Sequence, residues 1–268
     1  MREVLYEQHG PVLLLTINRE QAHNALNASV IQGIGDGVKS AAADPGIQAV
    51  VITGTGHKAF CAGADLKELD DISADDAHRN LNVGQEAFRA IETSGIPVIT
   101  AVNGLALGGG FELVLASTFP VLSTRASLGL PEASLGLIPG YGGTQRLPRA
   151  IGAATAAHLM LTGARLSANR AYELGLTPVE PVDPESLLTE AMACAERIAA
   201  QGPRAVQFIL ECLNASRDTP LGTGLRLETR LAATAAGGSE STEGIRAFFE
   251  KRSPDFLQAA EPKIDGEK

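Results

Sequence analysis

The sequence contains no tryptophan, and aromatic residues make up only 4% of its 268 residues. Proteins that bind single-stranded nucleic acid stack bases on aromatic side chains, so this scarcity argues against such a surface. Positive charge is also in deficit, because 22 lysines and arginines stand against 31 aspartates and glutamates, for a net charge of −9. Nucleic-acid phosphates are bound by basic faces. We therefore expect no nucleic-acid partner.

Cysteine is scarce as well, with only Cys61, Cys194 and Cys212. Their spacing matches no metal motif, and three cysteines cannot all pair, which favours a reducing compartment. The five histidines lie too far apart in the sequence for a local ligand motif, and no Gly-x-Ser-x-Gly segment occurs. A metalloenzyme and a serine hydrolase are therefore not expected.

Long hydrophobic runs are missing too. The most apolar stretch, residues 105–117, contains Glu112 and is too short to span a bilayer. Residues 1–7 include acidic side chains and no long apolar run, so they lack the features of a secretory signal. Together with the cysteine content, these observations predict a cytoplasmic protein with no membrane partner.

The patterns that are present predict a layered α/β domain followed by helices. In the first half, apolar runs predict strands at residues 4–6, 12–17, 49–53 and 98–102. Helical segments, one starting near Asn27 and one at residues 75–93, separate the later strands by enough chain for parallel pairing. After residue 152 strand signals nearly vanish, and helices are predicted at residues 152–161, 167–174, 184–200, 203–217, 221–236 and 240–251. We divide the chain into residues 1–195, carrying the site, and a helical region, residues 196–268.

Two glutamates, Glu112 and Glu132, stand inside apolar and glycine-rich segments, where an unpartnered charge is costly. The triplet Gly108-Gly109-Gly110 comes where a strand should give way to a helix, so first-turn amides are open to a ligand. Bare amides beside paired carboxyl groups suit proton transfer next to an anion-stabilising pocket. The alternatives are close helix–strand packing for the glycines, and a salt bridge or cap for each glutamate.

A second loop with exposed amides, Phe60-Cys-Ala-Gly-Ala-Asp65, follows the strand predicted at residues 49–53. Its small residues leave the main chain accessible. Asp65 is expected to cap a helical turn rather than to act in catalysis. Cys61 is expected to be a small buried residue, because no histidine is placed to activate it.

Four ordered motifs resemble those of the enoyl-CoA hydratase/isomerase (crotonase) family. They are Ala62-Gly-Ala-Asp65, Val102-Asn-Gly-Leu-Ala-Leu-Gly-Gly-Gly-Phe-Glu112-Leu, Pro131-Glu132 and Pro139-Gly-Tyr-Gly-Gly-Thr-Gln-Arg146. The resemblance continues to Phe248-Phe-Glu-Lys-Arg252 and so covers nearly the whole chain. It implies an α/β fold built as a spiral of ββα turns. It also implies that the helical region forms homotrimers, often paired into hexamers.

The resemblance also implies the residues of the site. The amides of Ala64 and Gly109 would form an oxyanion hole for the thioester carbonyl of an acyl-CoA substrate. Glu112 would hold and activate a water molecule, Glu132 would give and take the proton, and Gly140 would line the pocket beside the water. The predicted substrate-binding residues are Ala62, Ala64, Asp65, Leu66, Lys67, Gly109 and Gly140. No metal or redox cofactor is implied, since coenzyme A is part of the substrate.

Hydration of a 2-enoyl-CoA is the activity that both glutamates together favour, because relatives with other chemistry often lack one of them. An enoyl-CoA isomerase or another acyl-CoA lyase of the same fold remains the alternative, followed by a non-catalytic acyl-CoA binder. A dinucleotide-binding dehydrogenase is disfavoured, since Gly140-Tyr-Gly-Gly143 follows no clean strand.

Two features fit the resemblance less well. Thr118 stands where relatives often carry an aspartate, so we expect altered local bonding there rather than lost activity. The acidic chain must also bind the anionic CoA, for which the candidate cations are Lys58, Lys67, Lys251 and Arg252.

Overall fold

The computed structural model describes residues 2–68, 72–256 and 259. The chain divides into two compact units, residues 1–196 and 197–268. This division lies one residue beyond the boundary drawn from the sequence. No helix in the described part of the chain combines the length and apolar character needed to cross a membrane.

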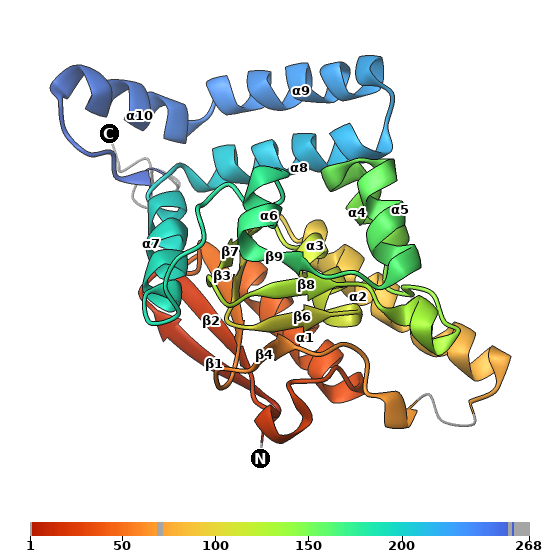
Figure 1. The fold of residues 1–268 in the computed structure, drawn as a ribbon. Coiled ribbons are helices and arrows are strands. Elements are labelled where there is room, and N and C mark those ends of the chain that lie inside the picture. The colour runs from red at the N-terminus through yellow and green to blue at the C-terminus, as the bar shows by residue number, and fades with distance from the viewer. Residues whose placement is uncertain (1, 69–71, 257–258, 260–268) are drawn as a thin grey trace. The chain divides into compact units, whose positions relative to one another are not determined.

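A five-stranded sheet forms one layer of the first unit (Figure 1). In spatial order its strands are β1 (Val4–His9), β2 (Val12–Ile17), β3 (Ala49–Gly54), β5 (Val98–Val102) and β7 (Phe119–Leu122). The β1–β2 pair is antiparallel and the other pairs are parallel. The predicted strands and their parallel pairing are confirmed. β7 was not predicted.

A second, smaller sheet is built from four short strands. Its order is β4 (Ala59–Cys61), β6 (Leu105–Leu107), β8 (Ser127–Gly129) and β9 (Leu166–Ser167). Each strand has at most three residues, too few to show an alternating pattern in the sequence. The prediction missed all four. One of them, β9, lies beyond residue 152, where strand signals nearly vanish in the sequence, and it pairs with β8.

The helices of the first unit begin at residues that supply caps or glycines. They are α1 (Ala28–Ala43), α2 (Ala74–Glu92), α3 (Gly109–Ala116), α4 (Gly143–Ile151), α5 (Ala153–Thr162), α6 (Ala168–Glu173) and α7 (Leu187–Ala199), which runs past the unit's end. Asn27 caps α1 by accepting the Val30 amide at 2.9 Å, and Ser73 caps α2. Short 3₁₀ turns are η1 (Glu20–Ala22), η2 (Leu66–Glu68) and η3 (Glu132–Leu135). α4 was not predicted, because it opens on glycines and contains Pro148.

The second unit contains α8 (Pro203–Asp218), α9 (Leu221–Ala236) and α10 (Ser239–Glu250), close to the predicted bounds. The α8 terminus is capped from α10, because both carboxylate oxygens of Glu240 accept the Arg204 amide at 3.1 Å. Large apolar side chains stay exposed on these helices, among them Ile209, Leu213, Leu221, Leu225, Ile245, Phe248 and Phe249.

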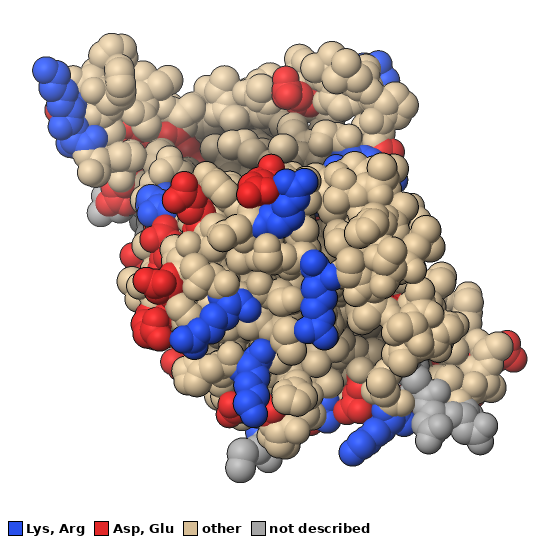
Figure 2. Space-filling model, in the orientation of Figure 1, with Lys and Arg blue, Asp and Glu red and all other residues tan. Residues whose placement is uncertain are grey.

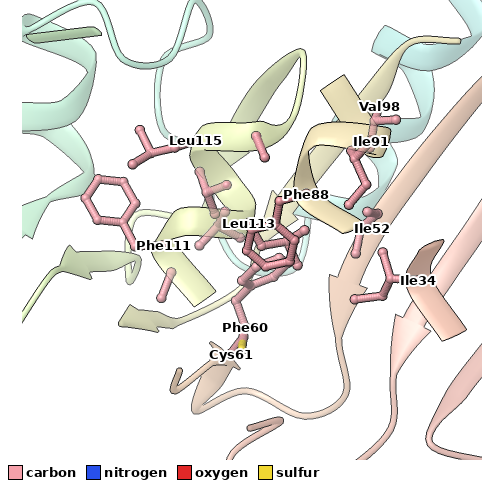
Figure 3. Close-up of a cluster of buried hydrophobic side chains, with 14 of the residues drawn as sticks. Ile34, Ile52, Phe60, Cys61, Phe88, Ile91, Val98, Phe111, Leu113 and Leu115 are labelled. Atoms are coloured by element: carbon pink, nitrogen blue, oxygen red, sulfur yellow. The ribbon is translucent and has the colours of Figure 1, made fainter. Parts of the chain in front are cut away.

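The core of the first unit encloses α3. Every residue of α3 is buried, and Phe111 packs in one apolar cluster with Phe60 of β4 and Phe88 of α2 (Figure 3). Gly110 allows α3 to approach β4 closely, because a Cβ there would collide with the Cys61 carbonyl oxygen. Glu112 lies in the first turn of this buried helix.

The hydroxyl of Thr118 serves the start of β5. The Val98 amide donates to Thr118 Oγ1 at 2.9 Å, and the Thr118 amide donates to the Val98 carbonyl at 2.7 Å. The side chain therefore satisfies a backbone group at the edge of the buried strand.

Thr118→Val tests that bond with nearly unchanged shape. We expect the free energy of unfolding to fall by about 1–3 kcal/mol, because the buried Val98 amide loses its acceptor. Chemical denaturation measures the change, and Thr118→Ser, which keeps an oxygen there, should lose less. Equal stability of Thr118→Val and the unchanged protein would show that the hydroxyl does not support the strand.

Candidate active site

Glu112 is fixed inside the protein by main-chain amides from a distant loop. Gly108, at φ +51°, is the N-cap residue directly before α3, and its carbonyl accepts the Glu112 amide at 2.9 Å. Glu112 Oε1 then accepts the amides of Tyr141 and Gly143 at 2.8 and 2.7 Å. Its second oxygen, Oε2, takes no hydrogen bond from the described residues. One oxygen thus anchors the carboxyl group, and the other is left for a ligand.

The environment holds Glu112 near the point of ionisation at neutral pH. The side chain is only 1% exposed, and this burial raises its pKa to about 7. The Gly143 amide opposes that rise, the charge of Glu132 adds to it, and the Tyr141 amide and Arg146 oppose it more weakly. A carboxyl group with this pKa can accept or release a proton at neutral pH.

Glu132 begins η3 directly after Pro131. Its Oε2 is buried with no hydrogen-bond partner, and burial raises the pKa of this carboxyl group. A Cβ on Gly108 would lie 2.9 Å from Glu132 Oε1, so Glu132 reaches the start of α3. Both glutamates therefore meet at one helix terminus. Neither glutamate takes part in an ion pair among the described residues, which argues against the alternative that each forms a salt bridge.

The two amides predicted for the oxyanion hole lie at the same terminus. Leu26 bonds to both neighbours of Ala64, through the Gly63 carbonyl and the Asp65 amide, each at 2.8 Å. In such a bridge the amide of Ala64 points away from Leu26. This amide donates a hydrogen bond to none of the described residues. Gly109 is the first residue of α3, so its amide has no partner within the helix. A Cβ on Gly63 would lie 3.6 Å from the Gly109 nitrogen, which shows that loop and helix touch.

The rest of the predicted binding loop is held by Arg19, which the sequence did not single out. Arg19 Nη2 pairs with Asp65 Oδ2 at 3.0 Å, and this bond lowers the pKa of the carboxyl group. Asp65 Oδ1 also accepts the Lys67 amide at 3.3 Å, which agrees with its expected capping role. The Ala62 amide donates to the His23 carbonyl at 3.0 Å, while Leu66 and Lys67 are exposed.

Gly140 lies beside the amides that hold Glu112. Its carbonyl accepts Gln85 Nε2 at 2.8 Å, and a Cβ on it would collide with the Leu81 side chain. The loop is thereby packed on α2. Cys61, by contrast, is fully buried, and burial raises the pKa of its thiol to about 12, so it stays a thiol at neutral pH.

Comparisons with known proteins agree with this geometry. A family model described as enoyl-CoA hydratase/isomerase matches residues 7–259. Crotonyl-CoA hydratase of Syntrophomonas wolfei is 38% identical over 254 residues, which cover 95% of this chain and 97% of that protein. The 2,3-dehydroadipyl-CoA hydratase of Escherichia coli is 39% identical over 261 residues, covering 96% and 99%.

The chain belongs to the enoyl-CoA hydratase/isomerase family. The crystal structure of an enoyl-CoA hydratase from Bacillus anthracis matches it with a TM-score of 0.91 at 37% identity, over 95% of this chain and 99% of that one. The predicted crotonase-type α/β fold is thus confirmed. The roles of individual residues in this family member, its trimerisation and its freedom from cofactors stay predictions.

Charge is mixed on the one face of this family member that Figure 2 shows. On the face shown in Figure 2, basic and acidic side chains are interspersed rather than gathered into one basic patch. Among the described residues, no group of three or more His, Cys, Asp or Glu side chains is arranged to hold a metal ion.

The pKa of Glu112 tests how closely the two carboxyl groups meet. In Glu132→Gln we expect it to fall below about 7, because a neighbouring negative charge is removed. Infrared difference titration of the protonated carboxyl band, assigned with Glu112→Gln, measures it. Glu173→Gln, at an exposed glutamate paired with Arg170, is the control. An unchanged pKa in Glu132→Gln would mean that the two groups do not interact.

Proposed function

We propose that this protein is an enoyl-CoA hydratase, which adds water reversibly across the double bond of a 2-enoyl-CoA to give a 3-hydroxyacyl-CoA. The observation that carries the proposal is the pair of carboxyl groups at the start of α3, from the buried Glu112 and the half-buried Glu132, each with an oxygen free of hydrogen bonds from the described residues. A water molecule between Glu112 and Glu132 would donate the hydrogen bonds that those two oxygens lack. Hydratases of 34–42% identity over most of the chain support the same activity.

In the proposed mechanism, the amides of Ala64 and Gly109 bind the thioester oxygen and make C3 electrophilic. Glu112, ionised, takes a proton from the water as its oxygen adds to C3. The one proton that the pair shares lies on Glu132 in the reacting state, and Glu132 delivers it to C2. Negative charge on the thioester oxygen grows only in the transition state, where one preorganised donor stabilises by about 3 kcal/mol.

The substrate class is proposed only as far as the thioester. Relatives of nearly equal similarity are named for crotonyl-CoA and for 2,3-dehydroadipyl-CoA, so family likeness does not select the acyl group. CoA would lie along residues 62–67, with phosphates near Lys58 or Lys67. CoA enters as part of the substrate, and the proposed chemistry calls for no metal or redox cofactor.

Turnover in Glu132→Gln tests the proposed roles. We expect kcat for hydration of a crotonyl-type thioester to fall about 100- to 10,000-fold, because the amide cannot supply the proton. Affinity for a saturated acyl-CoA should change little, since the oxyanion amides and the CoA loop are intact. Product analysis by mass spectrometry separates hydration from double-bond migration, which would show an isomerase. Near-normal hydration by Glu132→Gln would remove this residue from the chemistry, and Glu173→Gln serves as the control.

A homotrimer, or a hexamer built from two trimers, is the proposed assembly, in the cytoplasm. Phe248 and Phe249 of α10 are 78% and 77% exposed, which is costly for a lone chain in water. A subunit interface over this helix would bury them.

The assembly is tested by Phe248→Ser/Phe249→Ser. We expect the molar mass from light scattering to fall from three or six times 27.8 kDa toward that of one chain, since apolar area at the interface is lost. Glu228→Gln, an exposed change on α9, should leave the mass unaltered. A single-chain mass for the unchanged protein would contradict the proposed trimer.

A further inference from the structure

A nearly buried ion pair ties α2 to the loop that holds Glu112. Arg146 Nε and Nη2 donate to the two carboxylate oxygens of Glu92 at 2.9 and 2.8 Å. The side chains are 16% and 4% exposed. Two parallel bonds from one guanidinium orient it rigidly. The proposed mechanism gives this pair no part.

The third nitrogen of that guanidinium grips the loop itself. Arg146 Nη1 donates to the Tyr141 carbonyl at 2.6 Å, and a Cβ on Gly142 would collide with the same atom. The peptide group between Tyr141 and Gly142 is therefore fixed. It lies between the two peptide groups whose amides, at Tyr141 and Gly143, donate to Glu112. Holding the middle group restrains the direction of both donors.

Helix α2 supports the same loop with its apolar face. The Phe88 ring meets the Tyr141 ring edge to face at 5.4 Å between centroids. A Cβ on Gly84 would collide with the Tyr141 ring as well. The opposite edge of that ring lies along α3, because a Cβ on Gly109 would be 3.1 Å from Tyr141 Cδ2. The loop is thus clamped between α2 and the helix that carries Glu112.

We infer that Arg146, anchored by Glu92, is a positioning residue that aims Glu112 at the reacting water by fixing the 141–143 segment. The inference rests on the proposed role of Glu112. It gives Arg146 two effects on the reaction: it holds the geometry of the carboxyl group, and its positive charge favours the ionised form that accepts a proton. A purely structural ion pair would have neither.

The test compares Arg146→Gln with Arg89→Gln. Arg89 pairs with the same Glu92 carboxylate at 3.3 Å and is 46% exposed, whereas the bond to the Tyr141 carbonyl of the loop is made by Arg146. In Arg146→Gln we expect kcat for enoyl-CoA hydration to fall about 10- to 100-fold with little change in KM, since misplacing a reacting group slows the chemical step. The acid limb of the kcat/KM profile should move to higher pH, because the pKa of Glu112 rises.

Arg89→Gln should keep both the rate and the acid limb. Arg146→Lys retains the positive charge but loses the two parallel bonds of the guanidinium. We expect it to restore the position of the acid limb more fully than it restores kcat. Thermal unfolding of every variant separates lost stability from lost positioning. An Arg146→Gln protein that is less stable, but has the original kcat and acid limb, would overturn the inference. If Arg146→Gln does not fold, Glu92→Gln replaces it: a lowered kcat supports the inference and an unchanged one refutes it.

The inference and the proposed function fail in different ways. Absence of hydration by the unchanged protein on any enoyl-CoA thioester would refute the function. Infrared titration of Glu112, assigned with Glu112→Gln, still decides the positioning role in that case. The pKa should rise in Arg146→Gln and stay constant in Arg89→Gln; equal values in both would overturn the inference.

Discussion

The site depends on two main-chain amides that converge on one oxygen of Glu112. Without them, a carboxyl group in the first turn of a fully buried helix would be too costly to retain as an anion. Their donation fixes the rotation of the group, so Oε2 points away from its anchor. The amides belong to a loop far along the chain, and every element that shapes this loop therefore bears on the orientation of Glu112.

Opposing influences set the protonation of the pair. Burial favours protonation of both groups, and the charge of Glu132 adds to that effect at Glu112, whereas the amides of the loop and the charge of Arg146 favour ionisation of Glu112. The balance leaves the pKa of Glu112 at about 7. Two carboxyl groups in such surroundings can hold one proton between them at neutral pH, which is the state that concerted acid and base chemistry requires. The free oxygens of the two carboxyl groups lie beside the amides of Ala64 and Gly109, so a substrate could contact all of them together.

Much of this arrangement was visible in the order of residues. Apolar runs marked the long parallel strands, and glycines before Glu112 marked a helix start with open amides, as the structure has it. The short strands β4, β6 and β8 left no periodic trace, although β4 and β6 lead directly into the two loops of the site. The α4 helix was hidden by Pro148. Arg146 was noticed only as the last letter of a motif, because its partner Glu92 is 54 positions away.

The sequence alone determined which side chains and glycines are available at the site, and its motifs identified the family. Glycine leaves its backbone amide accessible and glutamate can carry a proton wherever they occur, so these properties can be read from the sequence. Only the tertiary structure decided that Glu132 reaches the start of α3, that two loop amides hold Glu112, and that Glu92 of α2 anchors Arg146 of α4 beside that loop. Those contacts join segments twenty or more positions apart. Their geometry follows from how the core packs, a property of the whole chain rather than of any local pattern.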